Sequence, residues 1–130
     1  MTTELTLLGW TLVLALVQIF LCAGMRTWET GVGYNMSARD DAAPPMRPIT
    51  ARLQRAQANL FETLPLFAAA VLIAHVAGRS GAETVLGCQL FLGARVLYVP
   101  LYAFGVPLVR TVAWGASLAG LLMIVKAILA

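Results

Sequence analysis

The polar side chains best suited to chemistry lie in residues 52–67, RLQRAQANLFETLPLF, which run directly into an apolar segment. At about 100° per residue, a helix places four of these side chains within an arc of roughly 80°. They are Arg52, Arg55, Asn59 and Glu62. Ionisable groups inside a membrane cost about 2.5–3.5 kcal/mol each, so they need partners within the protein or a polar ligand. Two interpretations stay open at this point: a polar lock between helices, and a binding site for a small zwitterion or anion.

A second polar face follows in the next apolar segment. Arg95, Tyr98 and Tyr102 have spacings of three and four residues, so a helix places them within about 60° of one another. Arg110 follows at the same expected membrane depth. With the two arginines of the first face, four arginines then surround a single intramembrane carboxylate, Glu62. This excess of positive charge favours an anionic ligand, because guanidinium groups bind carboxylates through paired hydrogen bonds.

Glutathione fits this set of side chains. Its two carboxylates suit the arginines, its ammonium suits Glu62, and its amides suit Asn59 and the tyrosine hydroxyls. Its sulfur is nucleophilic only as the thiolate, which a nearby cation stabilises. A phosphate head group could also satisfy the arginines, but it would explain Glu62 less well unless the lipid carried an amine.

Composition limits the class of protein. The chain has 130 residues, of which 60% are hydrophobic and 12% are charged, whereas soluble domains are about half apolar and a quarter charged. We therefore expect an integral membrane protein without a separate soluble domain. The net charge of +3 is spread among the expected helix ends, which gives no nucleic-acid signature. Cys22 and Cys88 lie inside apolar segments and show neither metal-ligand spacing nor a disulfide pattern, so no metal is expected.

Hydrophobic runs of about 20 residues predict an all-α bundle of four transmembrane helices in one domain, residues 1–130. The expected spans are residues 5–25, 51–77, 82–103 and 108–129, joined first by a long loop over 26–50. Arg26 should end the first helix, Thr50 should cap the second, and Pro65 should bend it. Prolines and glycines in the long loop disfavour a long helix there.

Basic residues predict the orientation. Six arginines lie at the first and third connections, whereas the other side carries only Arg79 and Lys126. The positive-inside rule assigns the first group to the cytoplasm, so both termini should be non-cytoplasmic. We expect the inner (plasma) membrane.

The run Arg52-x-x-Arg55-Ala-Gln57-x-Asn59-x-x-Glu62-x-x-Pro65-Leu-Phe67 resembles the signature of the MAPEG family, the membrane-associated proteins in eicosanoid and glutathione metabolism. Within that family the chain resembles microsomal glutathione transferases of bacterial type. The resemblance implies a homotrimer of four-helix subunits with glutathione between neighbours. It also implies a detoxifying transferase or peroxidase that takes lipophilic substrates from the membrane lipids. The family contains a member that binds lipid without catalysis, so a lipid-binding or scaffolding protein is the alternative.

The resemblance also implies roles for individual residues. The glutathione-binding residues of one subunit would be Arg52, Arg55, Asn59, Glu62, Arg95, Tyr98 and Tyr102. Arg26 and Gln57 would come from the adjacent subunit, which suits the position of Gln57 opposite the Arg55 face. Arg110 resembles the arginine that stabilises the thiolate and is the one expected catalytic residue.

Overall fold

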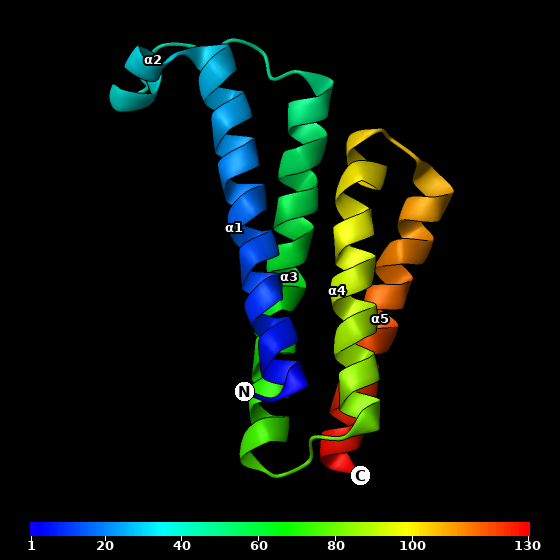
Figure 1. The fold of residues 1–130 in the computed structure, drawn as a ribbon. Helices are drawn as coiled ribbons and strands as arrows, with labels where there is room; N and C mark the ends of the chain where they lie inside the picture. The colour runs from blue at the N-terminus through cyan, green and yellow to red at the C-terminus, as the bar shows by residue number, and fades with distance from the viewer.

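The computed structural model describes all 130 residues as an all-helical chain (Figure 1). Its elements are α1 (Thr3–Thr30), α2 (Val32–Met36), α3 (Pro48–Val76), α4 (Ala82–Ala103) and α5 (Pro107–Leu129). Every helix except α2 is long and apolar enough to cross a membrane, and we call these four the long helices. Their outward side chains are largely apolar, as a bundle surrounded by hydrocarbon requires.

The four long helices run side by side, and both termini lie at one end of the bundle together with the α3–α4 turn (Figure 1). The α1–α3 connection and the α4–α5 turn lie at the opposite end, which we call the loop end. The short α2 projects from the end of α1, away from the other helices. This topology brings the start of α3, the end of α4 and the start of α5 to the same depth.

Packing in the middle of the bundle fixes the register of the helices. Leu60 and Phe67 of α3, Phe91 of α4 and Ile124 of α5 are fully buried. The rings of Phe67 and Phe91 stack with their centroids 4.0 Å apart. Because α3 and α4 meet along this face, their polar residues nearer the loop end also face each other.

Two glycines set the closest approach of α4 and α5. A Cβ added to Gly87 would lie 2.6 Å from the carbonyl oxygen of Gly120, and one added to Gly120 would lie 2.5 Å from that of Gly87. Small residues at such a crossing allow two membrane helices to approach closely. Toward the loop end the two helices separate (Figure 1), which leaves room for larger polar side chains between them.

A cluster centred on Glu29, which we call the Glu29 clamp, joins the end of α1 to the start of α3. The Glu29 side chain is only 5% exposed. Its Oε1 accepts a hydrogen bond from Arg26 Nη1 at 2.9 Å, and its Oε2 accepts from Thr50 Oγ1 at 2.5 Å and Arg47 Nε at 3.3 Å. The Arg47 guanidinium also lies over the Trp28 ring, 5.0 Å from its centroid. The clamp closes the base of the long α1–α3 connection.

The first helix is longer than the sequence suggested. We expected a span over residues 5–25 in a helix that Arg26 ends, but α1 continues to Thr30. The extra turn is held by the Arg26–Glu29 pair, three residues apart. Gly31, at φ 86°, then ends the helix.

The expected loop over residues 26–50 is also partly helical. It contains the α2 turn, and α3 begins at Pro48 rather than after a Thr50 cap. Proline is well suited to the first helical position, because its missing N–H would have no partner there. The Thr50 hydroxyl is free to donate to Glu29 and therefore does not cap the helix.

The close α4–α5 contact predicts that replacing two glycines of α5 by alanine has opposite effects on stability. Gly120→Ala should lower the melting temperature in detergent, because an overpacked contact costs about 1–3 kcal/mol. Gly115→Ala is the matched control, since a Cβ there meets nothing within 4 Å and alanine favours a helix. Equal melting temperatures for the two variants would contradict the close α4–α5 contact.

The Glu29 clamp predicts that the α1–α3 connection loosens when its carboxylate is removed. Glu29→Gln should speed proteolytic cleavage within residues 31–47 severalfold, because an amide cannot hold two guanidiniums. Glu83→Gln is the control, since Glu83 makes one exposed ion pair, with Lys126 at 3.0 Å. Equal cleavage rates in the two variants would show that the clamp does not restrain the connection.

Candidate functional site

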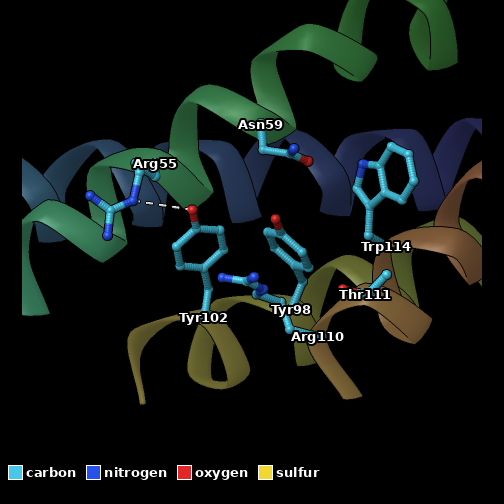
Figure 2. Close-up of a pocket in the computed structure, with 7 residues that line it drawn as sticks. All are labelled: Arg55, Asn59, Tyr98, Tyr102, Arg110, Thr111 and Trp114. Atoms are coloured by element: carbon cyan, nitrogen blue, oxygen red, sulfur yellow. Dashed lines mark hydrogen bonds between the residues drawn. The ribbon is translucent and has the colours of Figure 1, made fainter. Parts of the chain in front are cut away.

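A polar cavity of about 200 Å³ lies between α3, α4 and α5 near the loop end; we call it the tyrosine pocket. Its lining residues are Arg55, Asn59, Tyr98, Tyr102, Arg110, Thr111 and Trp114. Figure 2 shows the two tyrosines rising from α4 with their hydroxyls directed toward α3. Five residues expected from the sequence are thus brought to one cavity.

Tyr102 lies between two guanidinium groups. Arg55 Nε donates a hydrogen bond to the Tyr102 hydroxyl at 3.1 Å (Figure 2). On the ring face, Arg110 Cζ lies 4.5 Å from the Tyr102 centroid, a distance typical of a cation–π contact. Tyr98 meets the same ring edge-on at 5.4 Å. Neither arginine is in a salt bridge, so both positive charges remain available to an anion.

Arg95 lies behind this pocket rather than in its lining. Its side chain is 1% exposed, and Nη1 donates to Asn59 Oδ1 at 2.8 Å. Its guanidinium also covers the Tyr98 ring, with Cζ 4.4 Å from the centroid. Nη2 is buried without a hydrogen-bond partner. Arg95 therefore orients two pocket residues and retains one unused donor.

Two other residues expected from the sequence lie outside the pocket lining. Arg52 Nη1 donates to the Ala103 carbonyl at 3.3 Å and so covers the C-terminal end of α4. Glu62 lies on the same face of α3 as Arg55, is exposed, and makes no hydrogen bond or ion pair within the chain. A carboxylate without a partner next to a cationic pocket suits the ammonium group of a zwitterion.

A second polar cavity, of about 420 Å³, lies on the other side of α3, between α1, α2 and α3. We call it the amide pocket. It is lined by Ile19, Cys22, Ala23, Arg26, Thr27, Asn35, Arg39, Gln54 and Gln57. On a helix, Gln57 is about 200° from Arg55, so one chain presents the two pockets on opposite faces. Arg26 and Gln57, expected to act together, do share this cavity.

Sequence reasoning missed several lining residues. Thr111 and Trp114 belong to the tyrosine pocket, and Trp114 follows Arg110 by four residues, a spacing that could have revealed a shared face. Gln54 stands three residues before Gln57 and could have been found in the same way. Arg39 reaches the amide pocket only through the conformation of the α1–α3 connection, which no spacing rule predicts.

The Arg95–Asn59 pair predicts a coupled loss of stability. Asn59→Leu should destabilise the protein by about 1–3 kcal/mol, because it leaves a buried guanidinium without its acceptor. Adding Arg95→Met should recover part of that loss, since both polar partners are then replaced by apolar groups. Unfolding of the two single variants and the double variant in detergent measures the coupling. Strictly additive effects would contradict the pairing.

Comparison with known families agrees with this architecture. A protein-family model described as the MAPEG family matches residues 7–130, nearly the whole chain. No curated protein shows significant similarity to it. The family match and the four apolar helices together establish an integral membrane protein. The chain belongs to the MAPEG family, the membrane-associated proteins in eicosanoid and glutathione metabolism.

Proposed function

We propose that this protein is a membrane-bound, glutathione-dependent transferase or peroxidase of the microsomal glutathione transferase type. The observation that carries the proposal is the tyrosine pocket. It presents two guanidiniums without a carboxylate partner, an amide and two phenols between three membrane-spanning helices. Such a pocket suits a small anion with several hydrogen-bonding groups.

Each group of glutathione has a suitable partner. Arg55 would hold a carboxylate, Asn59 and the phenols would meet peptide amides, and Glu62 would take the ammonium. Arg110 would then lie beside the sulfur, where its positive charge favours the thiolate. Tyr102 keeps that guanidinium in place through the contact with its ring.

The chemistry that such a thiolate performs depends on the substrate. With an electrophilic carbon, a carbon–sulfur bond forms, the leaving group departs with its bonding electrons, and the thiol proton goes to solvent. With a hydroperoxide, the thiolate attacks the terminal oxygen, the O–O bond breaks and a sulfenic acid forms, while the released alkoxide takes a proton from solvent and becomes an alcohol. A second glutathione then converts the sulfenic acid to a disulfide and water.

We further propose that the complete site lies between two subunits. The tyrosine and amide pockets occupy opposite faces of α3, so the two pockets of a single copy cannot face each other. A head-to-tail contact around a symmetry axis would bring the tyrosine pocket of one copy against the amide pocket of the next. Three such contacts close a homotrimer. Each site then uses Arg26 and Gln57 from one chain and Arg55, Asn59 and Glu62 from its neighbour.

The proposed orientation places the loop end in the cytoplasm of a cell whose inner membrane holds the protein. That end carries most of the arginines, whereas both termini lie at the other end. Glutathione would enter from the cytoplasm, and the lipophilic electrophile would arrive laterally through the bilayer.

A non-catalytic lipid-binding or scaffolding protein is the second candidate. The same unpaired arginines could bind a phosphate head group, because the lining of the tyrosine pocket contains no carboxylate. Turnover separates the two candidates. A phospholipid that co-purifies in the pocket, without any thiol-dependent reaction, would favour the scaffold.

Glutathione binding and catalysis should depend on different arginines. In detergent, millimolar glutathione should raise the melting temperature of the wild-type protein, and Arg55→Ala should abolish that rise. Arg110→Ala should keep most of the rise yet lose turnover with a chlorinated nitrobenzene or a hydroperoxide by about 100-fold, because the thiolate loses its counter-charge. Arg79→Ala, at the far end of the bundle, is the control.

The glutathione proposal fails if the wild-type protein shows neither a thermal shift nor turnover. It also fails if Arg55→Ala and Arg110→Ala behave as the Arg79→Ala control does.

A further inference from the structure

An apolar groove of about 400 Å³ lies between α4 and α5, apart from both polar pockets; we call it the outer groove. Six residues of α4 and four of α5 line it, and no other helix contributes. On α5, Val112 of the groove is about 200° from Arg110 of the tyrosine pocket, so the two cavities lie on opposite faces of that helix. The outer groove therefore opens to the hydrocarbon of the bilayer.

Gly93, in the middle of the α4 wall, keeps the outer groove open. A Cβ added to Gly93 would meet nothing within 4 Å, whereas one added to Gly87 would collide with α5. No close helix contact therefore requires glycine at position 93, although glycine inside a helix is less favourable than alanine. Its missing side chain leaves space that an apolar molecule from the bilayer can fill.

Gln89 is the one polar side chain in the lining of the outer groove. It is exposed, and its amide makes no hydrogen bond within the chain. Hydrocarbon offers no hydrogen-bonding partner, and an amide left without one there is unfavourable. A plain hydrocarbon chain would fill the groove but would leave this amide unpaired. The lining therefore suits an apolar molecule that also carries an oxygen.

Gln89 lies too deep to meet the head group of a lipid. Along the axis of α4 it is about 10 Å from Ala82 at one end and about 20 Å from Ala103 at the other. The helix is thus about as long as the hydrocarbon core is thick, roughly 30 Å, and the ester groups of a phospholipid lie outside that core. Only an oxygen on the acyl chain itself can reach the Gln89 amide.

We propose that the outer groove binds a fatty acyl chain that carries a hydroxyl or carbonyl oxygen near its middle, and that Gln89 hydrogen-bonds this oxygen. The amide can donate to either group and can also accept from a hydroxyl. The hydrocarbon on both sides of the oxygen packs against the apolar walls, and the volume lies within the range of small-molecule sites. Binding here involves no thiol, so the inference stands apart from the proposed function.

The test compares two fatty acids, stearic acid and a stearic acid that carries a mid-chain hydroxyl. Native mass spectrometry of the intact protein in detergent gives an apparent dissociation constant for each acid. The wild-type protein should bind the hydroxy acid about fivefold more tightly than stearic acid, the gain typical of one hydrogen bond. Gln89→Leu should bind the two acids equally, because leucine has no hydrogen-bonding group.

A second pair of variants locates the chain in the outer groove. Gly93→Leu should weaken the binding of both acids severalfold, because its side chain occupies the groove. Gly115→Leu is the matched control, since a Cβ at Gly115 also meets nothing within 4 Å and Gly115 is not in the lining. This control should bind both acids as the wild type does.

Four outcomes would overturn the inference. Equal affinity of the wild type for the two acids would mean that the protein does not recognise the hydroxyl. An unchanged preference in Gln89→Leu would place that recognition elsewhere. Equal binding by Gly93→Leu and Gly115→Leu would show that the chain does not occupy the outer groove. A wild-type protein that binds neither acid, with an oligomer that Gly93→Leu dissociates, would identify the groove as a contact between copies.

Discussion

A membrane helix with polar groups on two opposite faces can satisfy only one of them inside a single four-helix bundle. Helix α3 is such a helix, with Arg55, Asn59 and Glu62 on one side and Gln54 and Gln57 on the other. Hydrocarbon cannot solvate either set, and an unsatisfied polar group there costs several kcal/mol. The bundle covers one face with the tyrosines of α4 and leaves the other beneath the α1–α3 connection. This constraint explains why the chain carries two half-open polar pockets and supports assembly around α3.

The arginines at the loop end have different partners in the fold. Arg95 is buried against Asn59 and Tyr98, and Arg52 covers the end of α4. Arg26 is matched by Glu29. Arg55 and Arg110 remain without a carboxylate and share the ring of Tyr102. The positive charge available to a ligand is therefore smaller than the count of arginines suggests, and it is concentrated at one aromatic side chain.

Periodicity predicted the helices and the shared faces because both follow from local geometry. The spacing of Arg95, Tyr98 and Tyr102 was enough to place them on one face, and the pattern around Arg55 was enough to indicate the family. The same reasoning failed at the end of α1, where the clamp around Glu29 depends on Thr50, which lies 21 residues further along the chain. Periodicity also does not reveal that Arg52 donates to the Ala103 carbonyl of α4. Both contacts are made across the fold, and no local pattern encodes them.

The central claim is that one site is built from the tyrosine pocket of one subunit and the amide pocket of the next. Subunits carrying Arg55→Ala and subunits carrying Gln57→Trp, each with its own affinity tag, can be produced together and purified through both tags. Each variant alone should bind no glutathione. In the mixed trimers one of the three interfaces pairs two intact half-sites, so binding should return to about one third of the wild-type stoichiometry. Mixed trimers that bind no glutathione would contradict the shared site.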